Sequence, residues 1–226
     1  MTQEEKKKFL DFLSQYITEN RKKLFYEVLQ YRTRHITIVL EDIYQPHNAS
    51  AVLRSADLTG IQDIHIIENR NTYEPNPEVA MGAFKWLNLI KYNKYENNTL
   101  DAYETLRKKG YRIVATTPHK NHYSLDTIPI DSKLAIVFGT ELKGLSDTAI
   151  DNADEYLKIP MYGFTESYNI SVSAALTMFT LTQRLRKSNI PWQLTPDEQL
   201  DILLEWTKRS IKRIENFENE FFKKYF

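Results

Sequence analysis

The segment 36-ITIVLEDIYQPHNASAVLRSADLTG-60 contains the local pattern that decides the fold class of this chain. It begins with the run 36-ITIVL-40, whose apolar and β-branched residues are typical of a buried strand. A polar turn follows, and Pro46 and Asn48 are residues that often begin a helix. Gly60 is a common helix stop. The segment therefore predicts a buried strand that passes through a short loop into a helix.

The helix predicted in this segment is rich in small residues and carries one long cation. Ala49, Ser50 and Ala51 allow another backbone to come close, whereas Arg54 stands alone among them. A surface ion pair with Asp57, three residues later, would be the ordinary explanation of Arg54. A functional role for Arg54 is the alternative, and the local sequence leaves both open.

The alternation of strand and helix continues along the chain, which favours an α/β fold. Apolar runs lie at 64–68, 112–116 and 134–138, with weaker ones at 87–92 and 155–159, and helical or turn-rich segments lie at 49–59, 76–84, 99–109, 145–152 and 170–187. Short apolar strands that alternate with helices predict a mostly parallel sheet with helices on both faces. The segment 170–187 is apolar or small nearly all round, so we expect it to be buried, in part at a subunit interface.

Helical segments without strands flank this central region. Residues 3–30 are expected to form two short helices, the second capped by Asn20. Thr195 and Pro196 are expected to start a terminal helix with the apolar stripe Leu204, Ile211, Ile214 and Phe221. We therefore predict a helical N-terminal extension at 1–35, a central domain at 36–187 and a basic helical C-terminal extension at 188–226. Four basic residues lie off the terminal stripe: Lys208, Arg209, Lys212 and Arg213.

The amino-acid composition limits both the cellular compartment that we expect and the chemistry that a functional site could use. The chain has 226 residues, no cysteine and a net charge of zero, so a disulfide framework and thiolate chemistry are excluded. No apolar run reaches transmembrane length, and the N-terminus is too polar for a signal peptide, so we expect a cytoplasmic protein with no membrane partner. Residues 1–35 hold 8 Lys/Arg against 5 Asp/Glu and residues 184–226 hold 9 against 7, while the middle is acidic. Basic ends could simply be solvated helix faces, or they could bind a polyanion.

Polar and small residues gather where the predicted strands end, which is where α/β sheets bind ligands. The segment 139-GTELKGLS-146 is not a P-loop, because Leu145 follows Gly144, and G-x-G-x-x-G is absent from the chain. A plain turn with an exposed Glu141 would also explain it. Ser167, Asn169 or Ser171 could each cap the helix that follows. His119 and His122 have a spacing that could suit a metal, but no carboxylate or cysteine pattern supports them, so no metal is expected.

Three segments together resemble the motifs of the SPOUT RNA 2′-O-methyltransferases, in the right order and spacing: 46-PHNASAVLRSADLTG-60, 139-GTELKGLS-146 and 159-IPMYGFTESYNISVSAAL-176. The resemblance covers roughly residues 36–187. It implies a C-terminal trefoil knot, a homodimer and S-adenosyl-L-methionine as cofactor. The helical extensions and 82-GAFKWL-87 point to the TrmH type, which methylates the D-loop guanosine at tRNA position 18.

The resemblance also assigns site residues. Asn48 and Arg54 match the catalytic positions of the first motif, Glu141 that of the second, and Ser167 and Asn169 those of the third. Cofactor-binding positions, which act largely through backbone groups, are matched by Thr116, Gly139, Ile159 and Tyr168. Glu166 and Tyr168 depart from the family pattern, which often has Gln and Leu there. On this basis tRNA would be the partner, with Lys208, Arg209, Lys212 and Arg213 as RNA contacts.

The family mechanism gives Arg54 the proton of the ribose 2′-hydroxyl. A guanidinium stays protonated in proteins, and a nearby phosphate favours its charged form. We therefore favour Arg54 as a clamp on a substrate phosphate. Methylation of 23S rRNA or of another tRNA nucleotide is the alternative within this chemistry. A non-catalytic RNA-binding module and a structural dimer with an empty pocket are alternatives of another class.

Overall fold

The apolar runs pair into one parallel sheet in the computed structural model, which describes residues 1–73, 80–120, 122–141 and 143–225. The six strands are β1 (Ile36–Glu41), β2 (Asp63–Ile67), β3 (Asn88–Tyr92), β4 (Arg112–Thr116), β5 (Leu134–Phe138) and β6 (Glu155–Leu157). Their order is β3-β2-β1-β5-β4-β6, and every pair is parallel. The predicted parallel sheet is confirmed.

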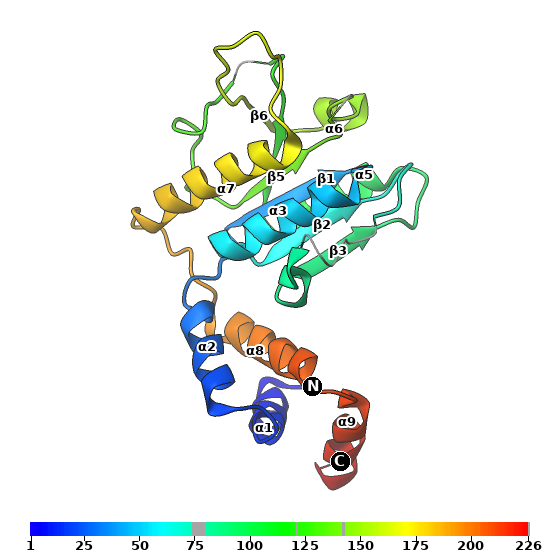
Figure 1. Ribbon diagram of the computed structural model, residues 1–226, viewed down its shortest axis with the longest axis vertical. Helices are drawn as coiled ribbons and strands as arrows, with labels where there is room; N and C mark the ends of the chain where they lie inside the picture. The colour runs from blue at the N-terminus through cyan, green and yellow to red at the C-terminus, as the bar shows by residue number, and fades with distance from the viewer. Residues whose placement is uncertain (74–79, 121, 142, 226) are drawn as a thin grey trace. The chain divides into compact units, whose positions relative to one another are not determined.

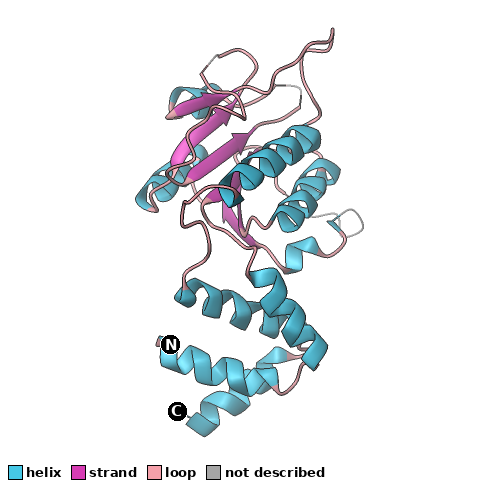
Figure 2. Cartoon of the chain, turned by 90° about the vertical axis from the view of Figure 1, so that its left-hand side faces the viewer, coloured by secondary structure: helices cyan, strands magenta, loops and turns pink. Residues whose placement is uncertain are grey.

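Helices cover both faces of this sheet, as predicted (Figures 1 and 2). On one face lie α3 (Pro46–Thr59) and α7 (Ile170–Arg186), and on the other lie α5 (Asn98–Lys108) and α6 (Asp147–Asp151). Alternate residues of β1 explain the arrangement: Ile38 packs in the cluster that contains α3 and α7, and Val39 packs in the cluster that contains α5. A strand buried on both faces needs the continuous apolar run that the sequence has.

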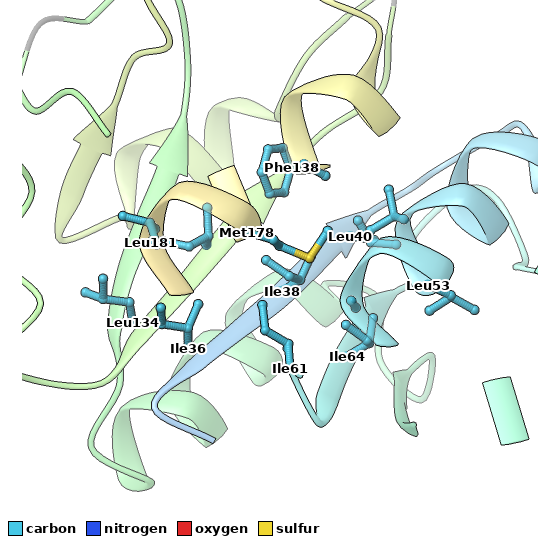
Figure 3. Close-up of a cluster of buried hydrophobic side chains, with 14 of the residues drawn as sticks. Ile36, Ile38, Leu40, Leu53, Ile61, Ile64, Leu134, Phe138, Met178 and Leu181 are labelled. Carbon is cyan, nitrogen blue, oxygen red and sulfur yellow. The ribbon is translucent and has the colours of Figure 1, made fainter. Parts of the chain in front are cut away.

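The larger core lies beneath α3 and α7 (Figure 3). Met178 and Leu181 of α7 meet the isoleucines and leucines of β1 and β5, and Leu53 of α3 packs beside Ile64 of β2. All of these side chains are at most about one-hundredth exposed. Burying one such side chain contributes roughly 1.5–3 kcal/mol, so this core fixes both helices on the sheet.

The structure corrects one helix cap and confirms one helix stop. Gly60 ends α3 in the left-handed conformation, with φ of 83°. Asn48 does not cap α3, because the helix begins at Pro46 after Gln45 and has no side-chain cap. The side chain of Asn48 instead bonds to a segment far along the chain, which leaves it unavailable to the backbone of its own helix. The predicted helical or turn segment 76–84 lies partly outside the described residues; its described end leads into the short helix η1 (Ala83–Lys85).

The chain divides into two compact units, Thr33–Trp192 and a helical unit that joins Met1–Arg32 with Gln193–Phe226. The helical unit consists of α1 (Gln3–Ser14), α2 (Glu19–Leu29), α8 (Pro196–Ser210) and α9 (Ile214–Tyr225). Its core combines leucines with aromatic rings, and Phe9 stacks on Phe221 with ring centroids 4.5 Å apart. Association of the two terminal segments with each other was not predicted from the sequence.

Two details of this helical unit correct the sequence predictions. Thr18 rather than Asn20 caps α2, because its hydroxyl accepts the backbone N–H of Arg21. The terminal segment is not one continuous helix, because it breaks between α8 and α9 at Ile211–Arg213, where Arg213 has φ of 55°. The predicted start is confirmed, since Thr195 and Glu198 form a capping box. None of the helices formed by described residues has the length and apolar character needed to cross a membrane.

Candidate functional site

The candidate site lies where the strand order of the sheet reverses. β1 and β5 are neighbours at the centre, and their carboxyl ends lead into the loop before α3 and the loop 139–146. Ligands in open α/β sheets bind at such a reversal, outside the carboxyl ends of the strands. Figure 1 shows α3 and the start of α7 near these strand ends.

Three side chains from distant segments meet here in one hydrogen-bonded triad: Asn48, Glu141 and Asn169. The Oε1 atom of Glu141 accepts from the Nδ2 atom of Asn169 at 2.8 Å and also from the Nδ2 atom of Asn48. The Nδ2 atom of Asn169 lies 3.3 Å from the Oδ1 atom of Asn48. Hydrogen bonds to a carboxylate are roughly twice as strong as neutral ones, so Glu141 fixes the orientation of both amides.

Two further side chains complete this network, and neither was assigned a role in the site from the sequence. The Oε1 atom of Gln45 accepts from Asn48 at 2.8 Å. Ser171 donates its backbone N–H at 2.8 Å and its hydroxyl at 2.5 Å to the Oδ1 atom of Asn169. Asn169 is therefore both the N-cap of α7 and a member of the triad. The only sequence signal for Gln45 was its place directly before the helix-starting Pro46.

The loop that carries Glu141 is held at both ends. Thr140 and Gly144 exchange two backbone hydrogen bonds of 2.9 Å, and Gly144 has a left-handed φ of 68°. A Cβ at Gly139 would overlap the backbone of Gly144 and Leu145, so only glycine fits there. The close approach accounts for Gly139, and the left-handed φ accounts for Gly144.

A buried carboxylate also anchors the far end of that loop. Glu41, at the end of β1, is 2% exposed. Its carboxylate accepts the backbone N–H of Ser146 at 2.9 Å, the hydroxyl of Ser146 at 2.8 Å and the hydroxyl of Thr99 at 2.6 Å. Ser146 in turn caps α6. Sequence reasoning missed Glu41 because its partners are far away in the sequence.

Arg54 and Ser167 are not joined to the triad. Arg54 is exposed on α3, and its side chain makes no hydrogen bond or ion pair with a described residue, so the ion pair with Asp57 that the sequence left open is not formed. Ser167 is exposed in the loop before α7 and forms no hydrogen bond within the described part of the chain. Both side chains are thus accessible to a ligand.

The expected cofactor positions follow three adjacent strands. β5, β4 and β6 are neighbours, so Gly139, Thr116 and Ile159 lie at or just beyond the same edge of the sheet. The hydroxyl of Thr116 donates to the carbonyl of Val137 at 2.7 Å, so its one hydrogen is already used within the sheet. Tyr168 is 44% exposed. The segment after β4 runs beside β6, since the backbone N–H of Tyr123 donates to the carbonyl of Tyr156 at 3.1 Å and the carbonyl of Tyr123 accepts from Lys158 at 2.9 Å.

The four basic residues of the C-terminal segment differ in their surroundings. Lys208 lies 3.0 Å from Glu218 and above the ring of Phe9, and Arg209 lies 3.9 Å from Glu205. Lys212 and Arg213 are exposed at the break between α8 and α9. The first pair therefore stabilises the helical unit itself, while the second pair points to solvent.

The two histidines with metal-like spacing have other surroundings. His122 stacks on Tyr123 with ring centroids 4.1 Å apart. His119 uses its backbone N–H to bond to the hydroxyl of Thr117. Over the residues that the structure describes, no group of three or more His, Cys, Asp or Glu side chains is placed to hold a metal ion.

Comparisons with known proteins agree with this geometry. The model of the SpoU rRNA methylase family matches residues 35–179. A tRNA (guanosine(18)-2'-O)-methyltransferase of Borreliella burgdorferi is 43% identical over 94% of this chain and 95% of its own length. The enzyme with the same name from Thermus thermophilus is 29% identical over 85% of this chain and 98% of its own. The crystal structure of the A. aeolicus TrmH/SpoU tRNA modifying enzyme, 25% identical, superposes with a TM-score of 0.76 over 86% of this chain and 98% of that one. The chain therefore belongs to the SpoU methylase family.

Proposed function

We propose that the chain transfers a methyl group from S-adenosyl-L-methionine to the ribose 2′-oxygen of the D-loop guanosine at tRNA position 18. The observation that carries this proposal is the triad of Asn48, Glu141 and Asn169 at the strand reversal, with an accessible Arg54 on α3, the helix that also carries Asn48. The Borreliella and Thermus relatives with the matching name align over nearly their whole lengths, which supports the same substrate.

The loops after β4, β5 and β6 are the part of the chain that would hold the cofactor. Gly139, Ile159 and Tyr168 would contact it mainly through backbone groups, with Thr116 beside them. When bound, S-adenosyl-L-methionine supplies an electrophilic methyl group. We assign these loops to the trefoil knot that the family resemblance implies.

The triad orients groups around the ribose. Both amide N–H donors on Asn48 are taken by Gln45 and Glu141. Its Oδ1 atom accepts from Asn169 at 3.3 Å and has a second lone pair that would accept from the ribose. Asn169 is fixed in the same way by Glu141 and Ser171. Holding a reactant in one orientation removes part of the entropic barrier to reaction. Ser167, which is exposed beside this network, would bind the ribose.

Arg54 would act as a clamp on a substrate phosphate. Its guanidinium keeps its proton, and its planar fork suits two phosphate oxygens at once. Such a cation stabilises the negative charge that develops on the 2′-oxygen as the proton leaves. A phosphate oxygen or a water molecule then accepts the proton. The exposure of Arg54 leaves it open to this contact.

We further propose that the chain acts as a homodimer through α7. One face of α7 packs on the sheet, but Val172, Leu176 and Phe179 are 45%, 41% and 61% exposed. Their spacing of four and three residues puts them on one side of the helix. A second copy that covers this stripe would bury apolar surface next to the motif at the start of α7.

The helical unit would bind the body of the tRNA. Lys212 and Arg213 are its most accessible cations among the four proposed RNA contacts, because Lys208 and Arg209 already face glutamates. Phosphate contacts by these residues would make binding weaken as salt rises.

The second candidate is 2′-O-methylation of ribosomal RNA, which the name of the matching family model favours. Mapping of 2′-O-methyl groups on tRNA and rRNA from cells with and without the gene separates the two. Loss of the methyl group at guanosine 18 alone supports the proposal. Loss at an rRNA nucleotide or at another tRNA nucleotide contradicts it, and no change at any site would favour a non-catalytic RNA-binding module.

A further inference from the structure

A cleft adjoins the triad on the side of β1 and β2. Its volume is about 870 Å³, and Asn48 and Glu141 form part of its wall. Sites for small molecules fall in the range of roughly 300–1,000 Å³. The cleft therefore has room for one nucleotide. None of the residues assigned to the cofactor or to RNA binding by the family resemblance lines it.

The floor of the cleft is fixed by hydrogen bonds that the chain makes with itself. Asp42 has a left-handed φ of 52°, and its Oδ1 atom accepts the backbone N–H groups of Asn69 at 2.7 Å and Arg70 at 2.8 Å. The amide of Asn71 returns to the carbonyl of Asp42 at 2.9 Å. The buried Glu41 holds the opposite wall at Ser146. A floor with its polar groups satisfied in this way is preorganised.

Of the lining side chains, eight are exposed: Tyr44, Gln45, Arg70, Glu96, Asn97, Glu141, Lys143 and Asp147. We take Tyr44, Arg70 and Lys143 among them as the recognition set of the cleft. Tyr44 is 76% exposed on the loop between β1 and α3, directly before Gln45 of the triad network. Arg70 and Lys143 are also exposed and are the two cations of the lining, which carries the exposed carboxylates of Glu96, Glu141 and Asp147 as well. An aromatic face beside two cations is the combination that binds nucleotides, since bases stack on the ring and phosphates pair with the cations.

We infer that this cleft receives the base of the nucleotide whose ribose is methylated, with Tyr44 as the stacking platform and Arg70 and Lys143 as phosphate contacts. The inference rests on the proposed function, because it takes the triad as the place of the ribose. The base is bonded to the same ribose, so it must enter a space that borders the triad. The cleft shares Asn48 and Glu141 with the triad and provides that space.

The test compares Tyr44→Ala, Tyr44→Phe and the control Tyr95→Ala in single-turnover methylation of a tRNA transcript at saturating S-adenosyl-L-methionine. Tyr95 is a tyrosine of similar exposure, 63%, that does not line the cleft. A lost base stack lowers the rate at limiting tRNA by roughly 5- to 150-fold. We expect that loss for Tyr44→Ala, recovery of most of the lost rate in Tyr44→Phe, which keeps the aromatic ring, and a rate within twofold of the wild type for the control Tyr95→Ala.

A binding measurement makes the result independent of activity. A transcript with 2-aminopurine at the target position should lose fluorescence when the wild-type protein stacks the base, and Tyr44→Ala should abolish that change. Cofactor affinity, measured by calorimetry, should be equal in all variants. Normal methylation and normal quenching by Tyr44→Ala would overturn the inference, as would a parallel loss of cofactor affinity. A wild-type protein that methylates no RNA would instead refute the proposed function.

Discussion

Replacement of Glu141 tests the triad most sharply, because a single carboxylate oxygen of Glu141 joins the other two members. Its Oε1 atom accepts from both Asn48 and Asn169, so Glu141→Ala removes two charge-assisted hydrogen bonds. Each such bond contributes about 1.5–3 kcal/mol, and the exposure of Glu141 favours the lower end. The total of about 3 kcal/mol corresponds to a roughly 150-fold slower methyl transfer.

Glu141→Gln should be much milder, since the carboxamide oxygen can occupy the Oε1 position and accept both bonds. Two neutral bonds of about 1 kcal/mol each remain, so the loss is about 1 kcal/mol, or roughly fivefold. The assay is a single-turnover measurement with saturating tRNA and cofactor, with Asp151→Ala, which removes another exposed carboxylate, as the control. Equal loss in Glu141→Gln and Glu141→Ala would refute the reasoning, because it would mean that the charge and not the orientation of the amides is needed.

Three further predictions follow from other parts of the molecule. Arg54→Lys should lower the plateau of the pH–rate profile for methyl transfer without changing the apparent pKa of that profile. A change in the apparent pKa would instead indicate that Arg54 is the base. Burial, with a smaller effect from Lys109, lowers the pKa of His65 to about 3. In the unfolded chain His65 therefore takes up a proton at a higher pH than it does in the folded protein. The free energy of unfolding falls as the pH drops from 6.5 towards 3. The unfolding free energy should therefore fall by about 2 kcal/mol more in the wild type than in His65→Phe between pH 7 and pH 5, as measured with urea, and equal losses would contradict this. Leu176→Lys should dissociate the proposed dimer, as measured by light scattering. The control Leu100→Lys should not, because Leu100 is 44% exposed on α5, on the opposite face of the sheet. A dimer that survives Leu176→Lys would exclude the α7 interface.

The strands of the central unit could be predicted because their signals are local and consistent. β1 and β5 are continuous apolar runs, and both are fully buried. Helix stops such as Gly60 were also predictable, since a left-handed conformation at that position needs a residue without a side chain. The terminal helices were expected, but the break at Ile211–Arg213 was not, because the apolar stripe continues across it.

The site was harder to predict from the residues alone, because its contacts are not local. Asn48 has the features of a helix cap, but its partner Glu141 lies 93 residues away, and that contact overrides the local preference. The same holds for Glu41, which reaches Ser146 across 105 residues. The motif resemblance identified Asn48, Glu141 and Asn169 together, whereas Gln45 and the cleft beside Tyr44 required the three-dimensional structure.

The central claim is that the oxygen methylated by this chain is the ribose 2′-oxygen of tRNA guanosine 18. The most direct test uses two tRNA transcripts that differ only in that oxygen, one with guanosine and one with 2′-deoxyguanosine at position 18. With isotopically labelled S-adenosyl-L-methionine, we predict one methyl group per molecule on the first transcript and none on the second. Equal incorporation into both transcripts would contradict the account, because the methyl group would then be attached to another atom.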